Sequence, residues 1–375
     1  MSNYVSRIIE SDMRQKLADN KAIIVYGARQ VGKSTMLKQL LKNDDSTLWL
    51  FGDQAQTQTL FNDISISNIK SLIGNNKVIV IDEAQMIKDI GIKLKMFTDH
   101  LDDIKIIATG SSSFDLANKI NEPLTGRKWE YHLLPLSFKE MAGVTSPFEE
   151  MGHLETRLIY GYYPEIVTHP GEEKERLLEL VTSYLYKDIL IWENLHKADK
   201  ITRLLQALAL QVGSQISYSE IGTIVGLDSK TVEKYIDLLE KTFIIYRLTS
   251  YSRNIRNELT NSKKIYFYDN GVRNALISAF NPLEVRDDIG MLWENFIMAE
   301  FLKKDKNSRN FAHRWFWRTK QKQEVDLIHE IDGVFTAYEF KWNHKKTVSC
   351  PSALKESYPE IAFHVINKNN FIDYL

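Results

Sequence analysis

Nine consecutive residues near the N-terminus have the types and spacing of a loop that holds phosphate. They match G-x-x-x-x-G-K-[ST] plus one further hydroxyl residue, and they are Gly27, Ala28, Arg29, Gln30, Val31, Gly32, Lys33, Ser34 and Thr35. Glycines let backbone N–H groups wrap phosphate oxygens, and the N-terminus of the following helix attracts negative charge. Lys33 is expected to reach the β- and γ-phosphates of ATP, and the Ser34 hydroxyl to bind Mg²⁺. The apolar run before the loop and the helical pattern after it disfavour a chance match.

Two carboxylates after another apolar run are expected to complete this site. Val78–Ile81 has the pattern of a buried strand, and Asp82 and Glu83 follow it directly. The carboxyl ends of such strands form the edge at which α/β sheets bind ligands. Asp82 is expected in the Mg²⁺ coordination shell, and Glu83 is expected to act as general base or to orient the attacking water. A helix-capping acidic pair is the structural alternative.

Two more segments are candidates for sensing or stabilising phosphate charge. A third apolar run, Ile104–Ala108, leads into Thr109-Gly110-Ser111-Ser112, where a hydroxyl could contact the γ-phosphate. Ordinary turn chemistry explains these residues nearly as well. Arg127, directly after Gly126, is a candidate for stabilising transition-state charge, and a solvated surface arginine is the alternative.

A second group of residues with chemical potential lies near the C-terminus. Strict alternation along Ala337–Trp342 puts Glu339 and Lys341 on one face, and Asp326 can present its carboxylate to them from across a hairpin. An Asp followed by Glu-x-Lys on the adjacent strand is the arrangement of PD-(D/E)xK nucleases. There the carboxylates bind Mg²⁺ or Mn²⁺, and the lysine positions or activates water. A half-buried hairpin with an ion-paired solvent face gives the same alternation.

The segment before this hairpin is rich in basic and aromatic residues. Asp305 is its only acid, and its basic residues are Lys303, Lys304, Lys306, Arg309, Arg314, Arg318, Lys320 and Lys322. Trp315, Phe316 and Trp317 are interleaved with them. Aromatic side chains among basic ones suit nucleic acid, although tryptophans on a strand more often belong to a core.

Length and composition are those of a soluble protein with two or three domains. The chain has 375 residues, 43% of them hydrophobic, and a formal net charge of -1. This charge gives no global attraction to nucleic acid or to an anionic membrane, so any such attraction needs a local patch. The single cysteine, Cys350, fits a reducing compartment. No signal peptide or membrane-spanning run is visible, so a cytoplasmic location is expected.

The elements that must position the phosphate site alternate between strands and helices. Continuous apolar runs are expected as strands buried on both faces, and they are Ala22–Tyr26, Leu48–Phe51, Val78–Ile81, Ile104–Ala108 and Tyr131–Leu134. The helical stretches between them predict a parallel sheet in a three-layer α/β domain. After Ser137 the pattern becomes helical, with helices expected at Leu154–Tyr160, Glu172–Leu195 and Ile201–Val212.

The pattern from Ser217 to Phe267 predicts a winged helix-turn-helix. Ser217 and Glu220 are spaced as a capping box for a short helix ending near Gly226, and Ser229 can cap the helix after it. Two β-rich runs, Phe243–Leu248 and Lys264–Tyr268, follow.

The second of these helices has no net basic charge. Lys230, Lys234 and Lys241 are offset by Glu233, Asp237 and Glu240. Because phosphate contacts dominate DNA affinity, this balance favours a lid or protein contact over insertion into a DNA groove.

The C-terminal part is expected to be a compact α/β unit. A helix is expected at Met291–Leu302, a strand at His313–Thr319, and a hairpin at Glu324–Ile331 and Val334–Lys341 around Asp332-Gly333, a strong turn signal. A helix near Ser352–Ser357 and a strand near Ile361–Ile366 follow.

The order of these motifs resembles a known family over nearly the whole chain. The shared segments are Gly27–Thr35, Asp82-Glu83-Ala84-Gln85, Thr109-Gly110-Ser111-Ser112, Leu124-Thr125-Gly126-Arg127, Pro135-Leu136-Ser137-Phe138, Gly161-Tyr162-Tyr163-Pro164-Glu165, Tyr268-Asp269-Asn270-Gly271, Trp293-Glu294-Asn295-Phe296 and Glu324-Val325-Asp326-Leu327-Ile328. They are similar to bacterial and archaeal AAA-type ATPases related to the STAND class. Those proteins carry a winged helix and a C-terminal domain of unknown function that resembles PD-(D/E)xK nucleases. By this resemblance, Glu294 corresponds to the further acidic metal ligand of the nuclease fold, and Val325 replaces the proline of its name.

Residues and resemblance together predict three parts. These are a P-loop AAA-type ATPase domain (1–145), a helical region (146–285) with a winged helix at about 215–268, and a nuclease-like α/β domain (286–375). The expected activity is Mg²⁺-dependent ATP hydrolysis coupled to a C-terminal domain that acts on or with nucleic acid. The alternative is an ATPase switch whose C-terminal domain only binds protein or nucleic acid. ATP and Mg²⁺ are the expected ligands; DNA, RNA, a protein partner and oligomers remain open, and no membrane is expected.

Overall fold

The computed structural model describes residues 4–62, 64–101, 103–111, 116, 119–120, 122–190, 198–252, 262–343, 345 and 348–375. The chain forms two compact units. The first comprises Met1–Leu134 with Lys241–Phe243, and the second comprises Pro135–Glu240 with Ile244–Leu375. In the described part of the chain, no helix combines the length and apolarity that a membrane crossing requires.

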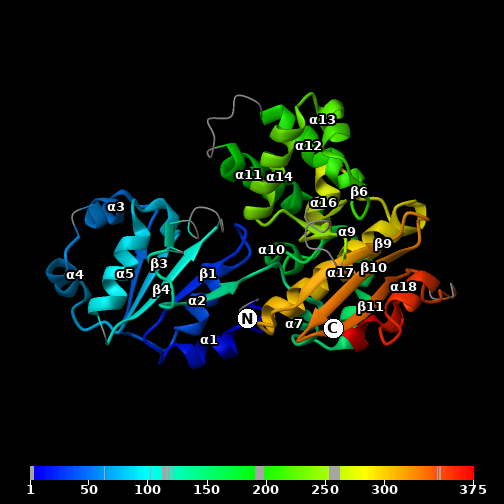
Figure 1. Cartoon of the computed structure of the whole chain (residues 1–375). Helices are drawn as coiled ribbons and strands as arrows, with labels where there is room; N and C mark the ends of the chain where they lie inside the picture. The colour runs from blue at the N-terminus through cyan, green and yellow to red at the C-terminus, as the bar shows by residue number, and fades with distance from the viewer. Residues whose placement is uncertain are drawn as a thin grey trace. The chain divides into compact units, whose positions relative to one another are not determined.

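The first unit is built on a five-stranded sheet in the order β2-β3-β4-β1-β5 (Figure 1). Every neighbouring pair is parallel. The strands are β1 (Ala22–Tyr26), β2 (Thr47–Phe51), β3 (Val78–Asp82), β4 (Lys105–Gly110) and β5 (Lys128–His132). All residues of β1, β3 and β4 are buried, which explains their continuous apolar runs. The expected parallel α/β sheet is confirmed.

Helices connect these strands, as parallel pairing requires. α1 (Glu10–Lys16) precedes the first strand, and the connecting helices are α2 (Lys33–Leu40), α3 (Ala55–Asn62), α4 (Ile66–Ile73), the short 3-10 helix η1 (Ala84–Met86) and α5 (Ile90–His100). The helix after the phosphate loop is therefore present, and it begins at Lys33.

The last strand of this sheet does not lie where its apolar residues predicted. The expected strand was Tyr131–Leu134, whereas β5 begins three residues earlier and ends at His132. β5 is an edge strand, and of its five residues only Tyr131 is buried. A half-exposed edge strand does not need a continuous apolar run, so the sequence pattern marked its end and missed its start.

The second unit starts with helices α7 (Phe138–Ala142), α8 (Pro147–Gly152), α9 (Leu154–Tyr160), α10 (Pro164–Val167), α11 (Glu173–Leu190) and α12 (Ala198–Leu210). These confirm the expected helical pattern, although residues 191–195 of the predicted long helix lie outside the described residues. Residues 136–138, with which the chain enters this unit, are held by buried polar contacts. Phe138 N–H donates to Glu300 at 2.9 Å, and the Lys303 ammonium donates to the Leu136 carbonyl at 2.9 Å.

A helix pair and a small sheet follow, made of α13 (Tyr218–Val225), α14 (Ser229–Lys241) and the antiparallel sheet β6-β8-β7. The strands are β6 (Gln215–Ile216), β7 (Ile245–Thr249) and β8 (Lys263–Phe267), and residues 253–261 between β7 and β8 lie outside the described residues. Ser217 caps α13, and Gly226 ends it in the left-handed conformation, as expected.

The predicted cap of α14 is wrong by one residue. Ser229 is the first helical residue, and the Asp228 carboxylate accepts the hydrogen bond from Thr231 N–H at 3.0 Å. Aspartate caps helices as well as serine does, so the pattern allowed either residue.

The C-terminal sheet has the order β12-β11-β10-β9. Its strands are β9 (His313–Arg318), β10 (Glu324–Ile331), β11 (Val334–Phe340) and β12 (Ala362–Ile366). β9, β10 and β11 pair antiparallel, and β12 joins β11 in parallel after α18 (Ser352–Ser357). The predicted Asp332-Gly333 hairpin is confirmed, with both residues at positive φ.

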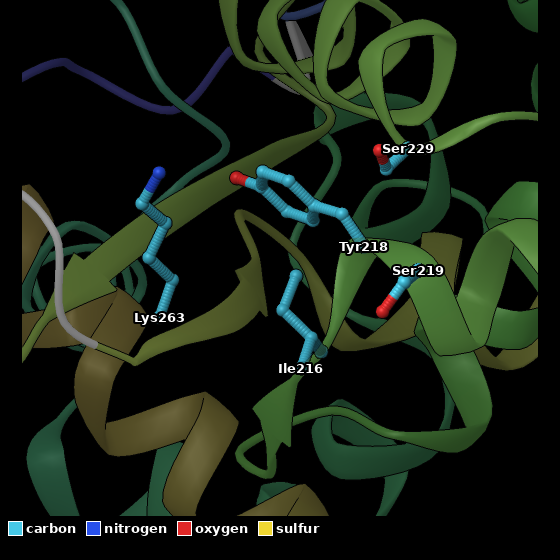
Figure 2. A pocket seen from close by; sticks show the side chains of 5 residues that line it. All are labelled: Ile216, Tyr218, Ser219, Ser229 and Lys263. Atoms are coloured by element: carbon cyan, nitrogen blue, oxygen red, sulfur yellow. The ribbon is translucent and has the colours of Figure 1, made fainter.

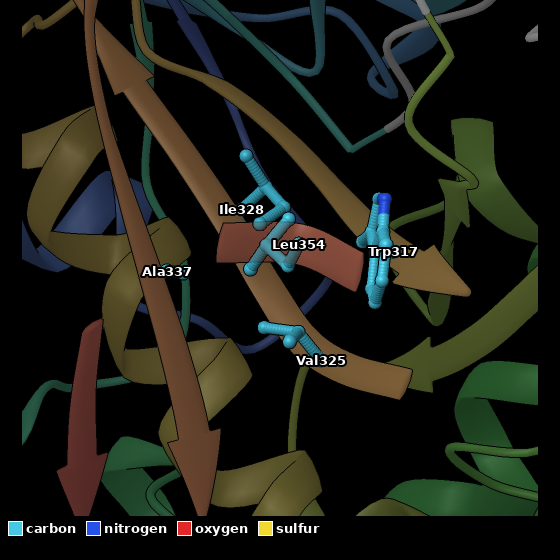
Figure 3. Packing of buried hydrophobic residues seen from close by; sticks show 5 residues of the cluster. All are labelled: Trp317, Val325, Ile328, Ala337 and Leu354. Atoms are coloured by element: carbon cyan, nitrogen blue, oxygen red, sulfur yellow. The ribbon is translucent and has the colours of Figure 1, made fainter. Parts of the chain in front are cut away.

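Helices cover both faces of this sheet. On one face, Phe301 of α17 (Ile289–Asn307) contacts Tyr338, with ring centroids 4.9 Å apart. On the other, Leu354 of α18 joins a hydrophobic cluster with Trp317, Val325, Ile328 and Ala337 (Figure 3). Val325 and Ile328 share this cluster although they are three residues apart, because the pairing of β10 with β9 shifts register between them. The sequence pattern of this strand did not predict the bulge.

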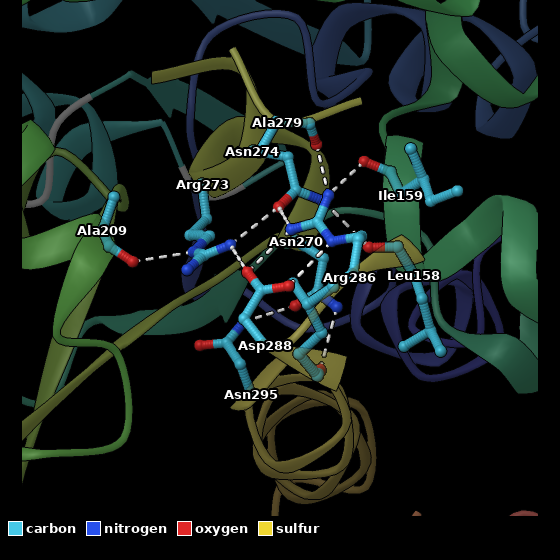
Figure 4. Close-up of polar contacts among 11 residues, drawn as sticks. Leu158, Ile159, Ala209, Asn270, Arg273, Asn274, Ala279, Arg286, Asp288 and Asn295 are labelled. Carbon is cyan, nitrogen blue, oxygen red and sulfur yellow. Dashed lines mark hydrogen bonds and ion pairs between the residues drawn. The ribbon is translucent and has the colours of Figure 1, made fainter. Parts of the chain in front are cut away.

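A buried polar network joins several elements of the second unit (Figure 4). Asn274 on α16 (Asn270–Leu276) donates to the carbonyls of Leu158 and Ile159 at the end of α9. Asn295 on α17 accepts from Phe267 N–H at 2.7 Å and donates to Asn270 at 2.6 Å. Conformational freedom of α9, β8, α16 and α17 is thereby restricted. A short 3-10 helix, η2 (Leu283–Val285), precedes α17, and another, η3 (Phe371–Tyr374), ends the chain.

Candidate functional site: a phosphate loop and a lysine-filled carboxylate cluster

The phosphate loop leaves the buried strand β1 and turns into α2. Gln30 and Gly32 have positive φ, which lets the loop turn sharply before Lys33. Gly27 is required for a second reason, because a Cβ there would lie 2.2 Å from the Leu133 carbonyl oxygen. The two glycines of the motif therefore serve close approach and backbone turning, respectively.

Lys33 is held against its own loop. Its ammonium donates to the carbonyls of Gly27 at 2.8 Å and Ala28 at 2.9 Å, and the residue is 5% exposed. The sequence did not predict a second cation beside this loop. Arg7 is buried, and its guanidinium donates to the carbonyls of Val31 at 3.1 Å and Leu134 at 2.6 Å. No local motif marks Arg7, since its partners are backbone atoms far away in the sequence.

The ends of β3 and β4 meet the start of α2 through one carboxylate. The Ser34 hydroxyl donates to Asp82 Oδ2 at 2.6 Å, and the Thr109 hydroxyl donates to Asp82 Oδ1. Thr109 also accepts a hydrogen bond from Glu83 N–H at 3.1 Å. The structure therefore brings together Lys33, Ser34, Asp82 and Glu83 at the sheet edge expected for them. A serine hydroxyl beside an aspartate carboxylate is a suitable oxygen donor set for Mg²⁺.

Glu83 has a strained backbone and a side chain with a defined partner. Its φ and ψ of 49° and 44° are left-handed, which is unusual for a residue other than glycine. The Gln85 amide donates to Glu83 Oε2 at 2.6 Å and to the Ser111 hydroxyl at 2.9 Å. Gln85 is buried, and its Oε1 has no hydrogen-bond partner among the described residues. Of the three hydroxyl residues predicted as candidate sensors, Thr109 bonds to Asp82 and Glu83, Ser111 bonds to Gln85, and Ser112 lies outside the described residues.

The structure separates Arg127 from the phosphate loop. Arg127 precedes β5, and its carbonyl accepts from Ala22 N–H at the start of β1. The phosphate loop follows Tyr26, at the other end of β1 and about 13 Å further along the strand. The Arg127 guanidinium, about half exposed, is paired with Asp99 at 2.7 Å. Within one chain, Arg127 therefore lies at the amino ends of the parallel strands, whereas the phosphate loop lies at their carboxyl ends.

The C-terminal carboxylates are surrounded by internal partners. Continuing the β10–β11 register by one residue puts Asp326 opposite Glu339, as the sequence predicted. Asp326 Oδ2 accepts from Phe340 N–H at 2.8 Å, and Glu339 pairs with Lys341 at 2.6 Å. Burial, reinforced by Glu294 and Glu339, holds the pKa of Asp326 well above its usual range.

A lysine that the sequence did not suggest joins this group from another sheet. Lys264 on β8 lies 2.6 Å from Glu324 Oε1 and 3.3 Å from Glu294 Oε1. The hydroxyl of Tyr266, two residues along the same strand, donates to Glu294 at 2.6 Å. Burial lowers the pKa of Lys264, but Glu294, Asp326 and Glu324 outweigh that effect and raise it above the ordinary lysine value. Within the described ranges, no three His, Cys, Asp or Glu side chains are grouped to hold a metal ion.

The basic and aromatic segment has several of its side chains paired or buried, whereas Lys304, Lys306, Lys320 and Lys322 are exposed. Lys303 pairs with buried Glu300 at 2.7 Å, Arg314 with buried Asp305, and Arg318 with Glu324 at 3.2 Å. Phe316 and Trp317 are buried in the core. For Phe316 and Trp317 the alternative of core aromatic residues therefore holds, and a role of the segment in nucleic-acid binding stays a prediction.

A pocket of about 340 Å³ lies between the helix pair and β8 (Figure 2). Its lining residues are Ile216, Tyr218, Ser219, Ser229 and Lys263. The Lys263 ammonium lies 5.1 Å from the centroid of the Tyr218 ring and 3.8 Å from Glu233. This arrangement has one cation with an acidic neighbour, which gives no strong anion site.

Comparison with known proteins assigns the first unit to a class. Residues 19–142 match the AAA domain family. Residues 151–283 and 289–373 match two families described as domains of unknown function.

Relatives share most of the chain at low identity. An uncharacterized protein of Mycobacterium tuberculosis is 24% identical over 346 residues, which cover 90% of this chain and 74% of the relative. An uncharacterized protein of Methanocaldococcus jannaschii is 24% identical over 349 residues, covering 86% and 75%. Among solved structures, a Walker-type ATPase of Pyrococcus abyssi is similar with a TM-score of 0.52 and 16% identity, covering 73% of this chain and 96% of that one.

The fold and these matches define the class of the first unit. The parallel sheet, the phosphate loop after β1 and the AAA match make it an AAA-type P-loop ATPase domain. Nucleotide binding, usually with Mg²⁺, is the property that this class implies.

Proposed function

We propose that the chain is a Mg²⁺-dependent ATPase whose first unit binds and hydrolyses ATP. The observation that carries this proposal is the Asp82 carboxylate, which joins the Ser34 hydroxyl at 2.6 Å to the Thr109 hydroxyl at the end of β4. This places one oxygen donor from the phosphate loop beside one from β3, where the ligands of P-loop proteins meet. Mg²⁺ held by Ser34 and Asp82 would neutralise charge on the β- and γ-phosphates.

The residues around this centre divide the work of binding and hydrolysis. The backbone N–H groups of Gly27–Ser34 cradle phosphate oxygens, and Lys33 exchanges its loop carbonyls for phosphate oxygens. Glu83 orients the attacking water or accepts its proton. Its left-handed backbone and its bond to Gln85 fix where the carboxylate points.

The second unit is the output of this ATPase in our proposal. We infer that α13, α14, β7 and β8 form a winged helix, and that residues 286–375 form a nuclease-like α/β domain. The carboxylates of that domain are engaged by Lys264, Lys341 and the backbone N–H of Phe340, which favours a non-catalytic module that binds a macromolecular partner. Release of phosphate would change what this module presents.

ATP hydrolysis by single-residue variants tests the proposal. Lys33→Ala should lower kcat/KM for ATP by about 100-fold or more, because it removes the cation that grips the phosphates. Lys38→Ala is the matched control, since Lys38 is an exposed lysine on the same helix. Equal rates for the two variants would contradict the assignment of the phosphate loop.

A further inference from the structure

Lys264 is buried in the second unit, where a lone ammonium would be costly. The residue is 2% exposed, and it comes from the central strand of the β6-β8-β7 sheet. Its ammonium lies between carboxylates of two other elements, Glu324 on β10 at 2.6 Å and Glu294 on α17 at 3.3 Å. A buried charge needs paired partners at such distances, and Lys264 has two.

Each carboxylate around Lys264 also interacts with another group of the protein. Glu294 accepts from the Tyr266 hydroxyl at 2.6 Å, and Glu324 also pairs with Arg318 at 3.2 Å. Asp326 accepts from the Phe340 N–H, and Glu339 is bound to Lys341. Both oxygens of Glu324, and one oxygen each of Glu294, Asp326 and Glu339, are thus already used by protein donors.

The residues present do not fit a divalent cation. Mg²⁺ requires near-octahedral oxygen ligands at about 2.0–2.1 Å. Here an ammonium lies between the carboxylates of Glu294 and Glu324, and the described residues contain no group of three acidic or imidazole side chains arranged around a common point. Two fixed cations, Lys264 and Lys341, supply positive charge that a metal would otherwise bring.

We propose that Lys264 is the resident cation of the cluster Glu294, Glu324 and Asp326, and that the cluster is an ion-paired joint and not a nuclease metal centre. This deepens the proposed role of the second unit as a binding module. The joint links β8, on the proposed winged helix, to α17 and β10 of the C-terminal domain. Because the cation belongs to the chain, the joint persists without divalent metal and ties these elements into one body.

The matched lysine for a test is the neighbour of Lys264. Lys263 lies on the same strand, is half-buried, and lies 3.8 Å from the Glu233 carboxylate. Lys264→Met should lower the Tm of the nucleotide-free full chain by about 10 °C, because it leaves buried carboxylates unpaired. Lys263→Met should lower it by less than about 2 °C. Similar shifts for both variants would overturn the proposal.

Metal dependence of the wild-type protein supplies a second test that needs no destabilised variant. Mn²⁺ is titrated into the nucleotide-free full chain, with Tm and cleavage of DNA and RNA measured on the same samples. We expect that Mn²⁺ causes no cleavage of DNA or RNA. Any increase in Tm that Mn²⁺ causes should be the same in the wild type and in Asp326→Asn. Metal-dependent cleavage or stabilisation that disappears in Asp326→Asn would overturn the proposal. If Lys264→Met does not fold, this arm decides alone.

ATP hydrolysis measured on the same wild-type samples separates the two proposals. Nuclease activity beside normal ATP hydrolysis would refute the lysine joint and leave the ATPase intact. Absence of ATP hydrolysis, with an unchanged lysine effect on Tm, would refute only the ATPase.

Discussion

At the scale of single residues, Gln85 connects the proposed catalytic carboxylate to the end of β4. Its amide donates to both Glu83 and Ser111, so it fixes the Glu83 side chain relative to the sheet. Gln85→Leu should keep ATP binding within about threefold and lower kcat about tenfold, because the carboxylate would lose its orientation. Steady-state kinetics and nucleotide titration measure the two effects separately.

The control for this prediction is Met86→Leu, a similar change at the neighbouring, half-exposed position. It should leave both parameters near wild type. A Gln85→Leu variant with unchanged kcat would show that Glu83 needs no support from Gln85.

Functional residues were predictable from the sequence where local spacing identifies them. The phosphate loop and Asp82-Glu83 have fixed spacing because one turn or one strand end must present all of their groups. Lys264 and Arg7 have no such spacing, since the partners named above lie 24 to 127 positions away. A lysine in a β-rich run usually indicates a solvent-exposed strand. Only the fold reveals the carboxylates beside Lys264.

At the scale of elements, the buried network around Asn274 joins α9 to α16. Asn274 donates to two carbonyls at the end of α9 and accepts from Arg273 at 3.0 Å and Arg286 at 3.2 Å. Asn274→Ala should lower the free energy of unfolding of the second unit by about 3 kcal/mol, because these buried groups lose their partner. Thermal or denaturant unfolding measures the effect.

Asn369→Ala serves as the control, since Asn369 is exposed in the same unit. Its effect should stay within about 0.5 kcal/mol. An equally small effect for Asn274→Ala would mean that water or neighbouring side chains replace the lost bonds.

Element types were predictable from the sequence, but some boundaries were not. Apolar runs identified β1, β3 and β4, because both faces of these strands are buried. The same rule misplaced β5, which is half exposed at the sheet edge, and it could not reveal the bulge in β10. Such features depend on what packs against a strand, which local periodicity does not contain.

At the scale of the whole molecule, the predicted catalytic role of Arg127 depends on assembly. Arg127 lies at the ends of the strands away from the phosphate loop, so a role in hydrolysis requires a second copy of the chain. On that hypothesis, ATPase activity rises more than linearly with protein concentration. Mixing Arg127→Ala with Lys33→Ala should then restore part of the activity, because each variant supplies what the other lacks.

Sedimentation with and without ATP measures the oligomeric state and tests the same hypothesis independently. A protein that stays monomeric at all concentrations, with no restored activity in the mixture, would leave Arg127 as the surface partner of Asp99. The division into domains 1–145, 146–285 and 286–375 likewise stays a prediction, to be tested by limited proteolysis.

In our proposal, binding and hydrolysis of ATP are separate tasks of Lys33 and Glu83, and the Glu83→Gln variant separates the two. Glu83→Gln keeps the shape of the side chain and removes its charge. We predict a Kd for Mg-ATP within about threefold of wild type and a turnover at least about 100-fold slower, because only the water-orienting carboxylate is lost. Hydrolysis by purified Glu83→Gln at the wild-type rate would contradict the proposal.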